Sequence, residues 1–525
     1  MADFFRMLSW SPSWWDLLLI VSYAFVLISV PSVLVEREGN PYSALTWILA
    51  LFAMPAVGLF FWWAFGRKHL VRKRRRRRKA SAHVWRSLAQ VRDGIDDVPY
   101  ASLAGVLPLK LPKDEASWVF PPTASNRVEL LNDAAEFYPA IEAAIRDARD
   151  HVHLLFYIWN DDATGARFRD LLVERATSGV DVRVLCDAFG SPRVRGSFMD
   201  PLRAAGGKIS VFLPPKYFTR SPALNFRNHR KIVVVDGRVG FVGGLNIGDE
   251  YSRDWRDVAI SIRGPAVDQL QEVFVDDWFF ASGEDITHAR YFGKWRDDPT
   301  SANSTDIEKS RVKPDAESTA DSVPDSALGS AKTRRKRIAD SAADATCAVV
   351  ASGPHTTNNS LHDALFISIT RAQKRIYITT PYFIPDQAIV TALRTAVYRG
   401  VDVRVLLPAK TDAPLVRLAA RSYYSHLLQA GVRLYEYQPT ILHVKSLLFD
   451  EDISVVGSAN MDLRSFKLNF EATCFIQSRT LAARMAEVFQ RDLRVSREVT
   501  LEEMANRTRW TKVTEAAAHL FSPMM

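Results

Sequence analysis

The chain has 525 residues, 47% of them hydrophobic, which is enough for several packed domains. Ten Lys and Arg between Arg67 and Lys79 account for its basic character, because removing them from the formal net charge of +9 leaves −1. This local charge excludes a broad nucleic-acid-binding surface, and three widely spaced cysteines exclude a disulfide framework or a zinc site.

The N-terminal segment, residues 1–66, is strongly apolar. Leu17 to Val35 is uncharged and would reach about 28 Å as a helix, close to the thickness of a bilayer's hydrocarbon core. A second apolar stretch runs from Ala44 to Phe65, beyond a short polar turn. Tryptophans stand near the ends of both stretches, as interfacial anchors do. The pattern predicts a two-helix transmembrane hairpin.

A cleaved signal peptide is the alternative for the first stretch, with Arg6 as its basic start. The absence of a small-x-small cleavage site and the second apolar stretch favour the hairpin. The basic residues that follow open a juxtamembrane segment and linker, 67–126. By the positive-inside rule they stay cytoplasmic, together with the rest of the chain, and they can contact anionic headgroups.

An internal repeat organises the remainder. The heptapeptide Gly-Val-Asp-Val-Arg-Val-Leu occurs at 179–185 and again at 400–406. In each copy a strand-like run and a helical pattern precede it, at 153–159 and 166–178 and at 377–383 and 387–399. This order predicts βαβ units with parallel strands. We therefore expect two similar α/β domains, a first half at 127–299 and a second half at 346–525, joined by a flexible linker at 300–345.

Each half carries the same polar motif in the same register. The first has His229, Lys231, Asp236 and Asn246, and the second has His443, Lys445, Asp450 and Asn460. Histidine and lysine two residues apart on a strand share a face. A hairpin turn at the aspartate reverses the chain and returns the asparagine to the end where the histidine lies. Each half thus supplies one imidazole, one ammonium and one carboxamide.

Two such clusters related by a pseudo-twofold axis would form one pocket suited to a phosphodiester. Lysines and amides can hold anionic oxygens as charge develops. One neutral histidine can attack phosphorus and one protonated histidine can donate to the leaving oxygen, since the ordinary pKa is about 6.5. No carboxylate cluster has metal-ligand spacing, so we expect metal-free chemistry. Either motif alone would more often be structural; its exact duplication favours catalysis.

These motifs resemble those of the phospholipase D superfamily, H-x-K-x4-D followed by G-[GS]-x-N, and within it the bacterial cardiolipin synthases. Further phrases carry the resemblance: Trp255-Arg256-Asp257, Thr380-Pro381-Tyr382-Phe383 and Arg464-Ser465-Phe466. The resemblance implies two pseudo-twofold-related α-β-α domains of the phospholipase D type behind the hairpin.

The resemblance also implies roles for single residues. His229 would be the nucleophile and His443 the general acid and base. The two lysines and two asparagines would hold the phosphate, with Ser458 beside them. Glu250 and Glu471 resemble the downstream acids that orient the histidines. Asp236 and Asp450 complete the candidate catalytic motif, but their place at the hairpin turn predicts a supporting role.

The implied reaction converts two phosphatidylglycerols to cardiolipin and glycerol without a cofactor, through a phosphohistidine. The implied location is the bacterial inner membrane, multi-pass, with the catalytic domains on the cytoplasmic side. Partners would be phosphatidylglycerol and other anionic phospholipids, and not nucleic acid. Phospholipid hydrolysis or headgroup exchange remains an alternative; a nuclease and a non-catalytic lipid-binding protein are weaker ones. The oligomeric state is open.

Overall fold

The computed structural model describes residues 14–38, 41–63, 71–95, 98–102, 119–213, 226–297, 342–356, 359–520 and 522. The described residues form two units, one before Arg77 and one from Arg77 onward, and each is considered by itself. Residues 300–341 of the predicted linker and the first basic residues, 67–70, lie outside the described residues.

The N-terminal unit contains three apolar helices, α2 (Trp14–Glu36), α3 (Pro41–Ala53) and α4 (Pro55–Phe61). Among the described residues, α2 is the one helix long and apolar enough to cross a membrane. The second apolar stretch is not the single spanning helix that we predicted. It breaks at Met54, because Pro55 has no amide hydrogen to continue the helix and instead begins α4. The 13 residues of α3 reach only about 20 Å.

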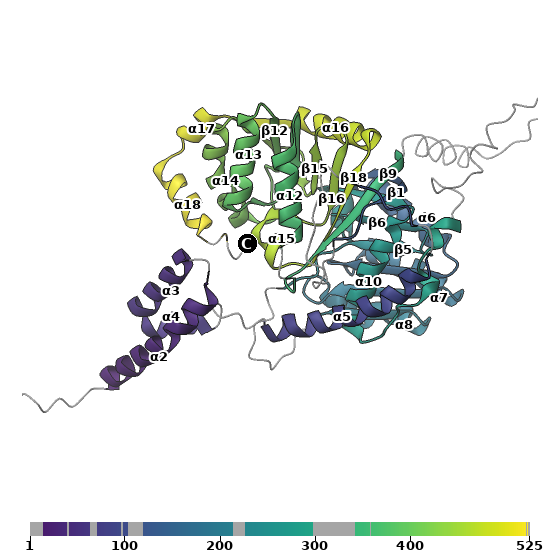
Figure 1. Ribbon diagram of the computed structural model, residues 1–525, viewed down its shortest axis with the longest axis horizontal. Helices are drawn as coiled ribbons and strands as arrows, with labels where there is room; N and C mark the ends of the chain where they lie inside the picture. The colour runs from purple at the N-terminus through teal and green to yellow at the C-terminus, as the bar shows by residue number, and fades with distance from the viewer. Residues whose placement is uncertain are drawn as a thin grey trace, which may run out of the picture. The chain divides into compact units, whose positions relative to one another are not determined.

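In the second unit, a 15-stranded mixed sheet joins both halves (Figure 1). The strand order is β19-β13-β12-β10-β15-β16-β18-β9-β1-β8-β6-β5-β2-β3-β4. Its strands are β1 (Thr123–Asn132), β2 (His151–Phe156), β3 (Asp181–Asp187), β4 (Lys208–Phe212), β5 (Ile232–Val235), β6 (Val239–Gly243), β8 (Val258–Arg263), β9 (Ala342–Ser352), β10 (Arg375–Thr379), β12 (Asp402–Pro408), β13 (Arg433–Tyr437), β15 (Ser446–Phe449), β16 (Ile453–Gly457), β18 (Glu471–Gln477) and β19 (Ser496–Val499). The halves meet where β1 pairs antiparallel with β9.

The predicted βαβ units are confirmed in both halves. Strands β2 and β3 are parallel and flank α7 (Ala163–Thr177), and β10 and β12 are parallel and flank α13 (Gln387–Tyr398). The end of the predicted linker needs correction. Strand β9 already begins at Ala342, and Ala345 is fully buried, so these residues belong to the sheet.

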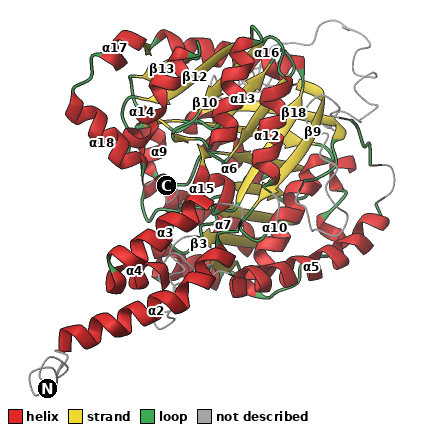
Figure 2. Ribbon diagram, turned by 60° about the vertical axis from the view of Figure 1, so that its left-hand side comes forward, coloured by secondary structure: helices red, strands yellow, loops and turns green. Residues whose placement is uncertain are grey.

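Helices cover both faces of the sheet (Figure 2). One face carries α10 (Ala266–Ser282), α16 (Arg479–Arg494) and α5 (Val71–Asp93), whose apolar side chains share one core with strands of both halves. The other face carries two separate cores. One contains α6 (Asp133–Arg146) and α7, and the other contains α12 (Ser360–Arg371), α13 and α14 (Pro414–Gln429).

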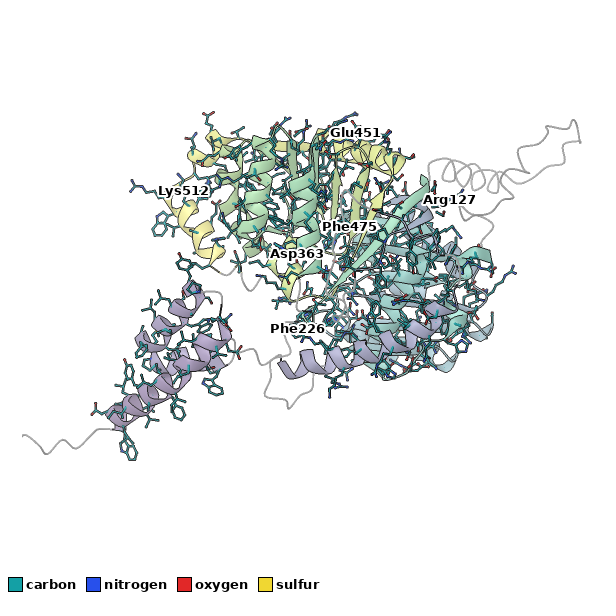
Figure 3. All side chains as sticks on the ribbon, in the orientation of Figure 1. Arg127, Phe226, Asp363, Glu451, Phe475 and Lys512 are labelled. Carbon is teal, nitrogen blue, oxygen red and sulfur yellow. The ribbon has the colours of Figure 1, made fainter. Side chains whose placement is uncertain are left out.

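Burial on both faces explains why the central strands are continuous apolar runs. Every residue of β5, Ile-Val-Val-Val, is buried, and Phe475 of β18, labelled in Figure 3, is fully buried. The three cysteines are buried and free. Because one core spans both halves, the two predicted domains pack as one body, and the site between them is fixed by that packing.

Candidate active site

Each histidine motif lies at the mouth of a β-hairpin, as predicted. His229 and Lys231 precede β5, which pairs antiparallel with β6 and brings Asn246 back beside them. The second half repeats this arrangement with β15 and β16. The local sequence therefore places an imidazole, an ammonium and a carboxamide at one end of each hairpin.

The two clusters come together in a single pocket. The His229 imidazole lies 3.1 Å from the backbone oxygen of Ser458, in the second half. The lysine of each half also contributes to lowering the pKa of the histidine in the other half: Lys445 acts on His229, and Lys231 acts on His443. The imidazoles and ammoniums of the two halves therefore lie close enough to influence one another's charge.

His229 is held by the other half of the molecule. Its Nδ1 lies 3.1 Å from Glu471 Oε2 and 3.1 Å from the Ser458 carbonyl oxygen, and its backbone N–H donates to Phe470 O at 2.9 Å. A carbonyl oxygen only accepts, so Nδ1 carries the ring proton. Nε2 then holds the lone pair, which is the tautomer that a nucleophile needs.

His443 is held in the reciprocal way. Its Nδ1 lies 2.7 Å from Asp257 Oδ2, and its backbone N–H donates to Arg256 O at 2.8 Å. This carboxylate corrects the sequence-based assignment of Glu250. The Glu250 carboxylate accepts from Asn160 Nδ2 at 3.3 Å instead, at the start of the short helix α9 (Asp249–Arg253). Asp257, and not Glu250, is the counterpart of Glu471.

A signal for Asp257 was present in the sequence. Asp257 follows His229 by 28 residues, and Glu471 follows His443 by 28 residues. Glu250 follows His229 by only 21 residues and so breaks the register that every other motif member keeps. The constant offset between the halves would have selected Asp257.

Both lysines are buried beside the histidines. Lys231 Nζ donates to His229 O at 2.6 Å, and Lys445 Nζ donates to His443 O at 2.6 Å. Burial lowers the pKa of Lys445 to about 8 and that of Lys231 well below its usual value, although Asp257 and Glu471 oppose the shift in both. A bound phosphate would add the negative charge that these buried ammoniums lack.

The histidine pKa values differ from the ordinary value assumed from sequence. Burial lowers the pKa of His229 to about 4, with Glu471 opposing and Lys231 adding to the shift. Burial and the two lysines lower the pKa of His443 well below 6.5. Both imidazoles are therefore neutral near pH 7. An anionic phosphodiester would favour protonation of one of them.

Comparisons with known proteins agree with this geometry. A model of the cardiolipin synthase, phospholipase D-like domain matches residues 141–278 and 365–493. The cardiolipin synthase of Alkalihalophilus pseudofirmus is 33% identical over 521 residues, covering 98% of this chain and 95% of that protein. The major cardiolipin synthase of Bacillus subtilis is 32% identical over 528 residues, covering 97% and 99%. The chain belongs to the cardiolipin synthase family.

A solved structure shows the same fold at greater distance. The crystal structure of phosphatidylserine synthase from Haemophilus influenzae Rd KW20 superposes with a TM-score of 0.54 at 14% identity. It covers 83% of this chain and 100% of that one. The duplicated α/β architecture is therefore that of the phospholipase D fold, and family membership makes this chain a membrane-associated phosphatidyltransferase of the phospholipase D type with phospholipid substrates.

The glycine-rich part of each motif differs between the halves for a packing reason. The Ser458 hydroxyl donates to Glu471 and accepts from Ala472 N at 3.0 Å, so it fixes the carboxylate that holds His229. The first half has Gly244 at the matching position. A Cβ there would lie 2.4 Å from Asp257 Oδ1, so the carboxylate that holds His443 leaves no room for a serine.

Both asparagines are buried. Asn246 Oδ1 accepts from Ile158 N at 3.1 Å, which orients its amide. The backbone N–H of Asn460 donates to Ser465 Oγ at 3.1 Å. Aromatic rings stand edge-on against the imidazoles. Tyr157 lies 5.0 Å from His229 and Trp255 lies 4.7 Å from His443, centroid to centroid.

Asp236 and Asp450 do not touch the pocket, in agreement with a supporting role and not with the catalytic one of the other motif members. Each sits at the far end of its hairpin with a positive φ, 53° and 51°. The Asp236 carboxylate accepts from the backbone N–H groups of residues 149, 150 and 151, and Asp450 does so from those of residues 373, 374 and 375. These bonds tie the hairpin turn to the start of the neighbouring strand.

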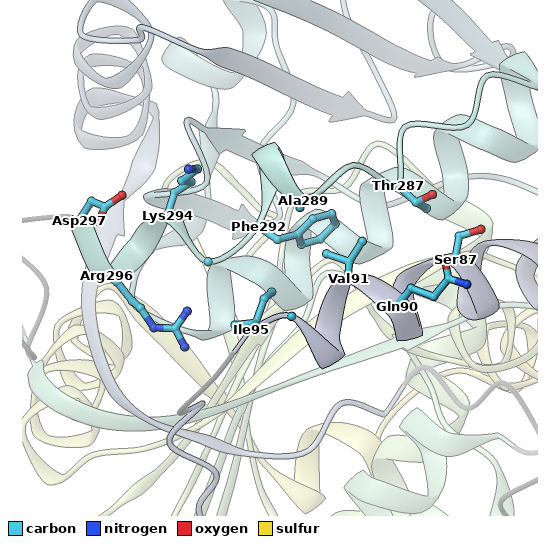
Figure 4. A pocket seen from close by; sticks show the side chains of 12 residues that line it. Ser87, Gln90, Val91, Ile95, Thr287, Ala289, Phe292, Lys294, Arg296 and Asp297 are labelled. Atoms are coloured by element: carbon cyan, nitrogen blue, oxygen red, sulfur yellow. The ribbon is translucent and has the colours of Figure 1, made fainter.

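A separate cavity of about 460 Å³ lies between the end of α5 and residues 287–297 (Figure 4). It is lined by none of the motif residues, so it is distinct from the histidine pocket. Within the described part of the chain, no group of three or more His, Cys, Asp or Glu side chains is arranged to hold a metal ion. Metal-free chemistry stays a prediction, which chelation would test.

Proposed function

We propose that this protein transfers a phosphatidyl group from one phosphatidylglycerol to a second, giving cardiolipin and glycerol. The observation that carries the proposal is the pair of imidazoles in one pocket, each held at Nδ1 by a carboxylate from the opposite half. This arrangement leaves both Nε2 atoms for the substrate, one on each side of a phosphorus atom. Membership of the cardiolipin synthase family supports the same activity.

In the first step, His229 Nε2 attacks the phosphorus of one phosphatidylglycerol. A P–N bond forms and the P–O bond to the headgroup glycerol breaks. Protonated His443 gives its Nε2 proton to the departing glycerol oxygen, and Asp257 stabilises the imidazolium while it carries that proton. The product of this half-reaction is a phosphatidyl-His229 and free glycerol.

In the second step, a primary hydroxyl of another phosphatidylglycerol attacks the phosphorus. Neutral His443 takes the hydroxyl proton, the new P–O bond forms and the P–N bond breaks, which restores both histidines. Lys231, Lys445, Asn246 and Asn460 hold the non-bridging oxygens throughout. One phosphodiester replaces another, so the exchange requires no nucleotide.

Water or another alcohol can compete for the same intermediate. Hydrolysis to phosphatidic acid and headgroup exchange are therefore the second candidate function. Their share depends on how well the pocket excludes water once the intermediate has formed. Product analysis with phosphatidylglycerol alone, and with added glycerol or ethanolamine, measures that share.

The membrane context follows from family membership, and its details are part of the proposal. Helix α2 would anchor the protein in the bacterial inner membrane in a multi-pass arrangement with the second apolar segment. The basic residues 67–79 would keep the catalytic body on the cytoplasmic side. Labelling of cysteines introduced before α2 and after α18 (Arg509–His519), in intact cells and in inverted vesicles, tests this topology.

The activity itself is tested with purified protein and phosphatidylglycerol as the only lipid. Cardiolipin and glycerol should appear in equal amounts. A requirement for a CDP-activated lipid would overturn the proposal. Cleavage of plasmid DNA by the same preparation would favour a nuclease, and lipid binding without turnover would favour a non-catalytic role.

A further inference from the structure

The residues on either side of the two histidines differ between the halves. Asn228 and Arg230 flank His229, whereas the buried apolar residues Leu442 and Val444 flank His443. Asn228 and Arg230 are themselves buried, at 1% and 0% exposure. Polar groups placed there need fixed partners, because a buried guanidinium without one is costly. In the first half, the histidine is therefore held by additional buried polar contacts of its two neighbours in sequence.

Asp277, fully buried on α10, is the partner of both flanking residues. Its Oδ2 accepts from Asn228 Nδ2 at 2.9 Å and from Arg230 Nη1 at 2.7 Å. The Arg230 guanidinium also donates to the backbone oxygens of Glu471, at 3.1 Å, and Ser352, at 3.0 Å. One carboxylate thus fixes the peptide before and after His229, and the same guanidinium fixes the strand that carries Glu471.

Arg77 of α5 completes this network from outside the sheet. Its guanidinium contacts Asp276 Oδ2, lies 2.7 Å from Asp277 Oδ1 and donates to Asp276 O at 2.9 Å. It is 2% exposed and lies 5.4 Å from the ring of Phe470, the residue whose carbonyl binds the His229 N–H. Although Arg77 belongs to the basic block predicted to face lipid, its side chain is buried in the catalytic body.

We propose that Arg77 is a positioning residue for His229. Asp277 between two guanidiniums is held in one place, and it can then fix Asn228 and Arg230. Without Arg77, the Asp276–Asp277 pair would lose one of its two guanidinium counter-charges, and Asp277 would be held through Oδ2 alone, by Asn228 and Arg230. A displacement of Asp277 would then move the peptide that carries the His229 imidazole away from Glu471 and from the phosphorus. The inference rests on the proposed function, because its test measures the turnover of phosphatidylglycerol.

The experiment compares Arg77→Gln, Arg77→Lys and Arg86→Gln in full-length protein, assayed with phosphatidylglycerol in mixed micelles. Arg86 is the matched control, since it lies on the same helix with an exposed side chain bonded to Ala82 O. We expect Arg77→Gln to lower kcat at least tenfold with KM within twofold of wild type. Arg77→Lys, which restores a cation but not the fork that reaches both aspartates, should recover part of the loss. Arg86→Gln should keep kcat within twofold.

A second comparison separates positioning from other roles. Because Arg77 and Arg230 act through the same carboxylate, Arg230→Gln combined with Arg77→Gln should lower kcat by less than the product of the single effects. Unchanged kcat in a folded Arg77→Gln protein, an equal loss in Arg86→Gln, or a raised KM with intact kcat would overturn the proposal. If Arg77→Gln does not fold, the kcat of Arg77→Lys decides in the same way. Failure of wild-type protein to turn over phosphatidylglycerol would contradict the proposed function instead.

Discussion

The imidazole of His443 lies 2.7 Å from the carboxylate of Asp257, a residue 186 positions earlier in the other half of the repeat. The reciprocal pair, His229 and Glu471, is separated by 242 positions. Each half therefore supplies the carboxylate that orients the other half's histidine. A single half would contain an imidazole without its orienting partner, so the duplication is required for the site and not merely a doubling of it.

This crossed pairing predicts unequal effects of two acidic substitutions. Asp257→Asn should lower kcat by about 10²-fold, because the amide cannot stabilise the imidazolium form of His443. Glu250→Gln should change kcat only slightly, since Glu250 bonds to Asn160 and not to a histidine. Steady-state rates of cardiolipin formation measure both. A larger loss in Glu250→Gln than in Asp257→Asn would restore the sequence-based assignment.

The roles of the two histidines should be distinguishable by whether the covalent phosphatidyl-histidine intermediate forms. His229→Ala should lower turnover by at least about 10³-fold and leave no covalent lipid on the protein. His443→Ala should lower turnover similarly, but it should still form phosphatidyl-His229 slowly with a substrate that has a good leaving group. Mass spectrometry after a brief incubation with such a substrate distinguishes them. Full activity in either variant would contradict the two-histidine scheme.

The pKa shifts predict a bell-shaped dependence of kcat/KM on pH. On the acid side, His229 must be neutral and Asp257 ionised; burial lowers the pKa of the first to about 4 and raises that of the second to about 6. Activity should therefore rise as pH increases between these values. On the alkaline side, His443 must be protonated to donate and Lys445 must stay protonated to bind the phosphate; the pKa of His443 is lowered well below 6.5 and that of Lys445 to about 8, in both cases chiefly by burial. Activity should therefore fall towards alkaline pH and be low above about pH 8, and a constant kcat/KM from pH 7 to 10 would exclude these roles.

Asp236 and Asp450 should matter for stability and not for chemistry. Asp236→Ala leaves three backbone N–H groups without their acceptor, including that of the buried His151, and should cost about 3 kcal/mol of unfolding free energy. Asp450→Ala should cost less, because the N–H groups it binds are more exposed. Denaturant titration gives both values. Specific activity per folded molecule should be unchanged, and its loss at unchanged stability would assign these residues to catalysis.

Chelation tests the prediction of metal-free chemistry. Dialysis against EDTA should leave the rate of cardiolipin formation within twofold of the untreated enzyme. The assay should use micelles, because divalent cations also bind the anionic substrate surface. Strong inhibition that a specific metal ion reverses would contradict the prediction.

The sequence was most informative where geometry is local. The two hairpins, the βαβ units and the positions of His229, Lys231 and Asn246 relative to one another follow from strand alternation and turn residues. The strands and helices of the βαβ units formed within four residues of the predicted bounds. The break in the second apolar stretch was missed because hydropathy was weighed over length without the effect of Pro55 on helix continuity.

The sequence by itself determined which chemical groups the pocket contains, because the repeat carries them in a fixed register and each hairpin gathers its own set. Only the tertiary structure decided which carboxylate faces which histidine, how far burial shifts the pKa values, and that Arg77 turns away from solvent to meet Asp277. Those properties arise from contacts between residues about 200 positions apart, on strands and helices that one shared core holds in place. Local pattern does not specify such contacts; the packing of the two halves against each other does.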